Sequence, residues 1–133
     1  MADYISTLDM SAFVLDYDYN APDHEFLNET HYNFYETVRK ANPNLPIILV
    51  SKPDFYMDYT SNMRRAVIMK TFSTARFNGD NNIYYVDGAS FFTQDYVGDY
   101  TVDTIHPTDR GFGQMAKNIG LNLARVLGFR EIL

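Results

Sequence analysis

Asp103 and His106 are the pair of side chains in this sequence best suited to chemistry. A carboxylate three residues ahead of an imidazole can turn back within a loop and accept a hydrogen bond from one ring nitrogen. The other nitrogen then serves as a base, because the reference pKa of a histidine is about 6.5. A histidine with its orienting aspartate supplies two thirds of a nucleophilic triad. The structural alternative is that Asp103 caps a turn and His106 is an ordinary exposed loop residue.

The other histidines and the paired acids carry weaker signals. His24 and His31 lie seven residues apart on one predicted helix, whereas two metal ligands on a helix favour a spacing of four. Because His31 falls on the apolar stripe of that helix, we expect a hydrogen-bonded core histidine. Two pairs of acids are candidates for a paired-carboxylate site, with loop acids or helix caps as the commoner explanation: Asp16 with Asp18, and Asp54 with Asp58. No Gly-rich phosphate loop is present, and we predict no metal and no cofactor.

Three short segments have the apolar character of buried strands: residues 12–17, 46–51 and 82–87. Their apolar residues run nearly continuously instead of alternating, which is typical of strands covered on both faces. The pattern therefore predicts a parallel sheet.

Helical segments alternate with these strands. In residues 24–41 the predicted inward stripe consists of Leu27, His31, Phe34, Val38 and Ala41, with Asp23 as the N-cap. A second helix is predicted from residue 61 or 62 to residue 77, with Arg64 and Arg65 on a solvated face. Thr108 caps the last helix, whose predicted stripe is Phe112, Ala116, Ile119, Leu123 and Val126.

The order of these elements predicts the architecture. Residues 2–9 look like the end of a further helix, so the order is α-β-α-β-α-β-α, which indicates a three-layer α/β/α fold. In open parallel sheets, ligands bind at the carboxyl ends of the strands. The segments that leave those ends include residues 18–22 and the stretch through residues 103–107. We therefore expect the candidate chemistry at this edge of the sheet.

Composition and charge exclude several classes of function. The 133 residues carry 11 basic and 17 acidic side chains, for a formal net charge of −6. This balance argues against a nucleic acid or an anionic membrane as the partner. The absence of cysteine excludes thiolate metal sites, cysteine nucleophiles and disulfides. The length suits one domain, and with no spanning apolar run and no visible export signal we expect a cytoplasmic protein.

Two segments resemble sequence blocks of a known family. Asp103-Thr104-Ile105-His106-Pro107 is similar to the last block of the SGNH hydrolases, also called GDSL esterases. Asp18-Tyr19-Asn20-Ala21 resembles their third block, Gly-x-Asn-Asp, with Asp18 in place of the glycine and Ala21 in place of the aspartate. The resemblance implies a flavodoxin-like α/β fold and a serine ester hydrolase. It also implies three catalytic residues, with His106 as the base, Asp103 as its orienting group and Asn20 as an oxyanion donor.

The blocks that would supply the nucleophile and a second oxyanion donor are missing from this sequence. None of its six serines, at positions 6, 11, 51, 61, 73 and 90, lies in a Gly-Asp-Ser context. Ser51, at the end of a predicted strand, is the best substitute, although we expect a structural hydroxyl there. We therefore interpret residues 1–133 as a single partial SGNH-hydrolase-like domain that lacks its first strands and is catalytically incomplete.

Two functions stay open. In the first, the chain is the C-terminal part of a serine ester hydrolase that acts, in its complete form, on carbohydrate or other acyl esters. In the second, it is a non-catalytic binding or oligomerisation module on the same scaffold. In the family's fold the strand at residues 12–17 lies between two others, so here it becomes an exposed apolar edge. We expect two chains to pair as a homodimer through this edge.

Overall fold

The centre of the molecule is a sheet of three parallel strands, β1 (Phe13–Leu15), β2 (Ile47–Val50) and β3 (Ile83–Val86), in the order β1-β2-β3. The computed structural model describes residues 1–53, 58–92 and 98–129. The predicted parallel sheet is confirmed. Each strand is shorter than the predicted segment, because the residues at the ends of each segment belong to loops and not to the ladder of paired strands.

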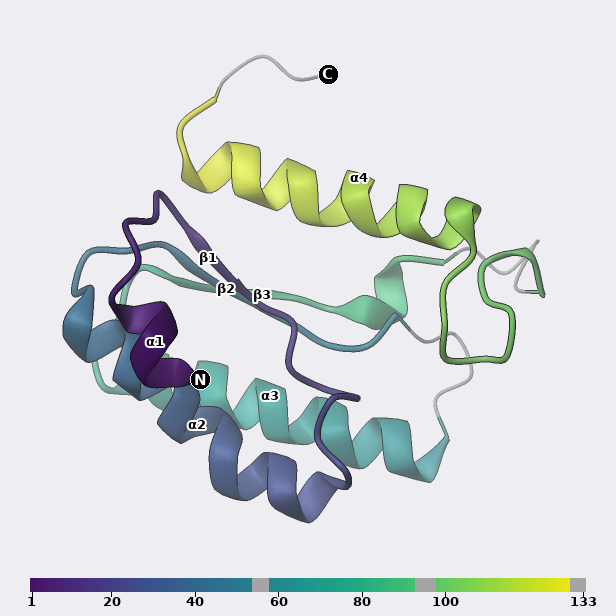
Figure 1. Ribbon diagram of the computed structural model, residues 1–133, viewed down its shortest axis with the longest axis horizontal. Coiled ribbons are helices and arrows are strands. Elements are labelled where there is room, and N and C mark those ends of the chain that lie inside the picture. Colours follow the sequence, from purple (N-terminus) through teal and green to yellow (C-terminus); the bar gives the residue numbers. More distant parts are fainter. Residues whose placement is uncertain (54–57, 93–97, 130–133) are drawn as a thin grey trace.

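Helices cover both faces of this sheet (Figure 1). Three helices lie on one face: α1 (Ala2–Ser6), α2 (His24–Ala41) and α3 (Tyr59–Phe77). The other face is covered by α4 (Asp109–Val126), and a short 3-10 turn, η1 (Gly88–Ser90), follows β3. The predicted three-layer α/β/α architecture is confirmed.

The long helices begin at side chains that cap their first turns. Asp23 accepts a hydrogen bond from the Phe26 N–H at 2.7 Å at the start of α2. Asp58 accepts one from the Ser61 N–H at 2.7 Å, so α3 begins before the predicted residue 61. Thr108 caps α4, as predicted. Such caps satisfy N–H groups that have no partner within the helix.

The buried side chains form one cluster on each face of the sheet. Beneath it, side chains of β1 and β2 such as Leu15 and Leu49 pack against α2 and α3, where Leu27 and Ile68 are fully buried. Above it, Val50 and other β2 and β3 side chains form the second cluster, against which α4 packs.

The predicted stripe of α4 is wrong in its first half. The side chains that pack on the upper cluster are Met115, Ile119, Leu123 and Val126. Phe112 is 56% exposed, because the first turn of α4 extends past the carboxyl ends of the strands (Figure 1). Ala116 is exposed because Met115 takes the inward position, and consecutive helical residues are turned about 100° apart.

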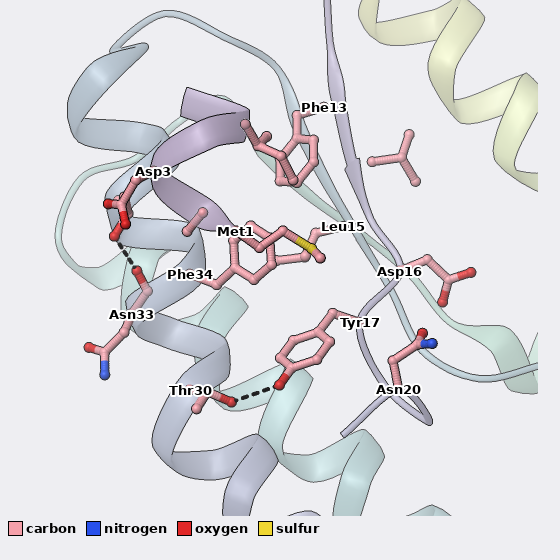
Figure 2. Close-up of a pocket in the computed structure, with 14 residues that line it drawn as sticks. Met1, Asp3, Phe13, Leu15, Asp16, Tyr17, Asn20, Thr30, Asn33 and Phe34 are labelled. Atoms are coloured by element: carbon pink, nitrogen blue, oxygen red, sulfur yellow. Dashed lines mark hydrogen bonds between the residues drawn. The ribbon is translucent and has the colours of Figure 1, made fainter. Parts of the chain in front are cut away.

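β1 is an edge strand with a groove beside it. Within the described residues it pairs with β2 alone, through bonds such as that from the Phe13 N–H to the Pro46 carbonyl at 2.9 Å. A groove of about 760 Å³ runs between α1, β1 and α2, and Phe13, Tyr17 and Phe34 are among its lining residues (Figure 2). The expected apolar edge is therefore present in the described part of the chain.

Candidate active site

Asp103 and His106 form the hydrogen bond that their spacing predicts. His106 Nδ1 lies 2.6 Å from Asp103 Oδ2. The other carboxylate oxygen, Oδ1, accepts hydrogen bonds from the backbone N–H groups of Ile105 at 3.0 Å and His106 at 2.7 Å. The side chains of His106 and Asp103 are 73% and 50% exposed. Asp103 therefore caps the turn and also orients an accessible imidazole.

These hydrogen bonds keep the Asp103 carboxyl ionised. The backbone N–H of His106 lowers the pKa of Asp103 most, and together with the His106 side chain and the Ile105 N–H it brings that pKa to about 2. A carboxylate beside Nδ1 favours the tautomer in which Nδ1 carries the proton. Nε2 is then the proton acceptor that general-base catalysis requires.

The loop that carries this pair closes on itself. The Val102 N–H donates to the His106 carbonyl at 2.9 Å, and the Thr108 N–H donates to the Tyr100 carbonyl at 2.9 Å. Thr104, at the tip, has a φ of 70°, which β-branched residues rarely adopt. Local backbone geometry therefore makes the sharp turn that returns His106 to Asp103.

Side chains at the start of α4 fix the base of the same loop. Arg110 Nη1 donates to Asp99 Oδ2 at 2.8 Å, and its guanidinium lies 5.1 Å from the centre of the Tyr100 ring. Tyr100 is buried and stacks on Phe92 with ring centres 4.7 Å apart. A Cβ at Gly111 would lie 2.1 Å from the Tyr100 carbonyl oxygen, so only glycine fits there. The spacing of residues in the sequence gives no signal for the pair of Asp99 and Arg110, which lie 11 positions apart.

Asn20 lies in the loop that follows β1, at the rim of the groove (Figure 2). Asn20 is exposed, whereas Asp18 and Ala21 on either side are only 3% and 2% exposed. This loop and the loop of Asp103 both lie at the carboxyl ends of the strands (Figure 1). Within the described residues no hydrogen bond joins Asn20 to Asp103 or His106. The three candidates therefore share one edge of the sheet without direct contact.

The prediction that Arg64 belongs to a solvated helix face is wrong. Its side chain is buried and donates to the carbonyls of Asp18 at 2.7 Å and Ala21 at 3.0 Å. Arg65 points elsewhere and donates from Nε to Asp87 Oδ1 at 2.8 Å. One signal in the sequence could have identified Arg64: it precedes three buried residues of α3, Ile68, Thr71 and Ala75, at helical spacing.

Ser51 is a structural hydroxyl, as expected. The residue is 1% exposed, and its Oγ accepts a hydrogen bond from the Gly88 N–H at 2.9 Å. The same Oγ lies 3.1 Å from the Tyr85 hydroxyl. In the part of the chain that the structure describes, no serine hydroxyl hydrogen bonds with His106. The structure therefore offers the base no serine nucleophile among these residues.

The remaining candidates have structural roles. His31 is buried, with Nδ1 2.9 Å from Thr71 Oγ1, so the predicted core histidine is confirmed, and burial lowers its pKa to about 4. Asp58 caps α3, and Asp54 lies outside the described residues. Asp16 is exposed, whereas Asp18 is buried and accepts a hydrogen bond from the Lys52 N–H at 2.8 Å, so Asp18 has a structural role.

Across residues 1–53, 58–92 and 98–129, no three His, Asp or Glu side chains gather where they could hold a metal ion. No helix in these ranges is long and apolar enough to cross a membrane.

Comparison with family models gives a match over most of the chain. The model of the GDSL-like lipase/acylhydrolase family matches residues 1–124. The chain belongs to this family. The resemblance based on the blocks at residues 18–21 and 103–107 is therefore confirmed at the level of the family. The comparison with curated proteins gives no match.

Solved structures share the GDSL-family fold. A protein described as a GDSL-like lipase from Bacteroides ovatus gives a TM-score of 0.81 at 24% identity, over 96% of this chain and 39% of its own. A family two carbohydrate esterase from Clostridium thermocellum, in complex with cellohexaose, gives a TM-score of 0.75 at 19% identity, over 93% of this chain and 38% of its own. A salicylyl-acyltransferase from a tetracycline biosynthetic pathway gives a TM-score of 0.72 at 19% identity, over 94% of this chain and 40% of its own. The chain spans about two fifths of the length of these structures.

Proposed function

We propose that this chain carries the base and oxyanion side of a serine ester hydrolase site. The observation that carries the proposal is the 2.6 Å contact between Asp103 Oδ2 and His106 Nδ1, in a loop that leaves the imidazole accessible. Membership of the GDSL-like lipase/acylhydrolase family supports ester chemistry. The other nitrogen of this imidazole is the group that would act on a hydroxyl nucleophile.

The roles follow from the chemistry of acyl transfer. Nε2 of His106 takes the proton of a serine hydroxyl as that oxygen attacks the ester carbonyl, and it later protonates the leaving alcohol. Asp103 holds the imidazole and stabilises the imidazolium. The Nδ2–H of Asn20 donates to the oxyanion of the tetrahedral intermediate. Water then releases the acid from the acyl-enzyme by the same steps.

We further propose that the nucleophile lies outside these 133 residues. No serine here stands in a Gly-Asp-Ser context. Ser51, the best substitute, is buried and holds the Gly88 N–H. Without a nucleophile beside His106, hydrolysis by this chain alone is expected to be negligible.

Hydrolysis of nitrophenyl acetate tests both proposals. The assay compares the 133-residue chain with a chain extended by the coding sequence upstream of Met1. We expect ester cleavage by the extended chain alone, lost on His106→Ala and reduced by about 100-fold or more on Asn20→Ala. Equal and negligible rates for both chains would contradict the proposed hydrolase.

For the substrate we propose a carbohydrate ester or another acyl ester. The support is the structural neighbour that is named a carbohydrate esterase and was solved with cellohexaose. Release of acetate from acetylated cello-oligosaccharides by the extended chain, compared with release from nitrophenyl acetate, separates the two classes. A preference for the simple aryl ester would argue against the sugar.

The open edge of β1 favours a second candidate function, a homodimer built through this strand. The Phe13 N–H bonds to β2, and peptide groups alternate along a strand, so the N–H of Val14 faces the open side. An unpaired apolar edge is a template for another strand. A second copy, related by a two-fold axis, would cover it.

Light scattering at micromolar concentration measures this association. We expect a dimer for the unchanged chain and a folded monomer for Val14→Pro, because that proline removes an N–H on the open side. The matched variant Phe13→Pro removes the bond to Pro46 and is expected to destabilise the sheet itself. A clean monomer for the unchanged chain would refute the proposed dimer.

A further inference from the structure

The loop that carries Asn20 is held from beneath by one buried side chain. Arg64, on α3, is 3% exposed. Its Nη1 donates to the Asp18 carbonyl at 2.7 Å and its Nη2 donates to the Ala21 carbonyl at 3.0 Å. These two carbonyls bracket the residues between them, so one guanidinium fixes both ends of the segment that contains Asn20.

The side chains around Arg64 complete this support. Asp18 Oδ1 lies 3.7 Å from Arg64 Nη1, and Asp18 Oδ2 accepts the Lys52 N–H at 2.8 Å. Two cations lie over the ring of Tyr19, with Arg64 4.5 Å and Lys52 4.2 Å from its centre. Asn20 is the exposed residue of this segment. The arrangement therefore ties down its neighbours and leaves the Asn20 amide facing solvent.

Only an arginine suits this position. A guanidinium is a planar fork whose donors can reach two acceptors at once, whereas a lysine ammonium is a point charge on a flexible stem. Asp18 and Ala21 are also the two positions at which this loop departs from the Gly-x-Asn-Asp pattern. Both hydrogen bonds from Arg64 go to backbone carbonyls, and the Asp18 carboxylate adds an ion pair at 3.7 Å.

We propose that Arg64 is a positioning residue that sets the shape of the loop from Asp18 to Ala21 and thereby aims the Asn20 side chain. The catalytic consequence rests on the proposed function of Asn20. The structural consequence does not, because the contacts of Arg64 with the loop hold whatever Asn20 binds.

Hydrogen exchange and NMR of the 133-residue chain test the structural part, with Arg64→Met as the variant and Arg65→Met as its matched control. The control removes the neighbouring arginine and its bonds to Asp87 but leaves the loop contacts in place. In Arg64→Met we expect amide exchange at residues 18–21 to speed up by more than amide exchange in β2 does. We also expect the NMR signals of the Asn20 side-chain amide to shift. Both changes should be absent in Arg65→Met.

Arg64→Lys keeps the test open if Arg64→Met does not fold, because the lysine retains the buried charge opposite Asp18. It is expected to restore part of the protection at residues 18–21. If exchange at residues 18–21 speeds up only as much as exchange in β2 does in every Arg64 variant, the loop responds no differently from the way it does in Arg65→Met. That result would overturn the proposal.

A double-mutant cycle in the extended chain tests the catalytic part. Arg64→Lys is expected to lower kcat about 10-fold with little change in KM, and to have no further effect on kcat once Asn20→Ala is present. Additive effects would overturn the positioning role. If Asn20→Ala alone leaves kcat unchanged, the proposed function of Asn20 fails, while the exchange result still decides how Arg64 acts on the loop.

Discussion

The two loops that carry the candidate catalytic residues are held in different ways. The loop of Asp103 and His106 is exposed, and its turn depends on hydrogen bonds between residues two to four positions apart. The loop of Asn20 is held by Arg64, which lies 46 and 43 residues away from the two residues it contacts. One loop is therefore built locally, and the other depends on the packing of α3 beneath the sheet.

This difference separates chemistry from stability. Changes at an exposed, locally bonded pair have small effects on folding, because water replaces most of what is lost. Changes at a buried charge leave its partner uncompensated, which typically costs about 3–5 kcal/mol. Substitution of Asp103 or His106 should therefore report on catalysis, whereas loss of the Arg64 charge beneath the second loop should also destabilise the fold.

The largest expected effect is on catalysis and comes from the exposed loop. Asp103→Asn keeps an oxygen that accepts the Ile105 and His106 N–H groups but places an N–H donor against Nδ1, which favours the wrong tautomer. We expect kcat of the extended chain to fall about 10⁴-fold. The free energy of unfolding should change little by comparison, because the pair is exposed to water. Nitrophenyl acetate kinetics and urea unfolding measure the two quantities.

Asp109→Asn, at the first residue of α4, is the control for this variant and should leave kcat unchanged. If the free energy of unfolding of Asp103→Asn falls by as much as its activation free energy for hydrolysis rises, the exposed loop is not independent of the core.

The second prediction concerns the effect of low pH on stability through the buried residue His31. The Tyr17 ring, just before the Asn20 loop, stacks on His31 with ring planes 4° apart. Burial lowers the pKa of His31 to about 4, so as the pH falls below ~6.5 the unfolded chain takes up a proton that the folded chain does not. His31 therefore favours the folded state above that pH, and about 3 kcal/mol should be lost as the pH approaches 4.

Urea unfolding between pH 7 and pH 4 measures this loss, and His31→Gln isolates it from the titration of the carboxylates. The variant should have a flatter dependence of stability on pH. Hydrogen-exchange protection factors, which correct for the slower intrinsic exchange in acid, should fall more at residues 18–21 than at residues 102–106 on acidification. The same pH dependence in both proteins would contradict the assignment to His31.

The third prediction uses two glycines of α4 to test how firmly the exposed loop is attached. Gly111→Ala would place a Cβ 2.1 Å from the Tyr100 carbonyl, so the loop must shift, at a cost of about 1–3 kcal/mol. Gly113→Ala meets nothing within 4 Å and should stabilise the helix by up to about 1 kcal/mol. Thermal unfolding of both variants gives the two values, and equal shifts would argue against a tight contact at Tyr100.

The same contrast explains what the sequence could predict. The hydrogen bond between Asp103 and His106 spans three residues, and the caps at Asp23 and Thr108 also depend on close neighbours. Such features follow from spacing and residue type. The parallel sheet was also predictable, because β2 is buried throughout and its apolar run is unbroken.

Contacts between distant segments were not predictable in this way. The sequence predicts a solvated face for Arg64 because charged residues are rarely buried, and nothing near it in the sequence points to the loop 43 residues away. The helical spacing of Phe112 predicts that it lies in the core. Its exposure depends on where the sheet ends, which the helix pattern does not contain.

The smallest expected effect is a change in one pKa, and it tests how local the exposed loop is. The backbone N–H of His106 is the first cause of the low Asp103 pKa of about 2, and His106→Ala retains it. We therefore expect the pKa of Asp103 in this variant to rise but to stay below its ordinary value of 3.8.

A carboxyl ¹³C NMR titration of both proteins measures this pKa. Because folding lowers it, the ionised carboxylate favours the folded state above the unfolded pKa, and that contribution disappears as the pH falls towards 2. Should Asp103 titrate at 3.8 or higher without the imidazole, the side chain of His106 holds the carboxylate and the loop is not preformed. A value below 3.8 means that the backbone turn holds the carboxylate in place for the base.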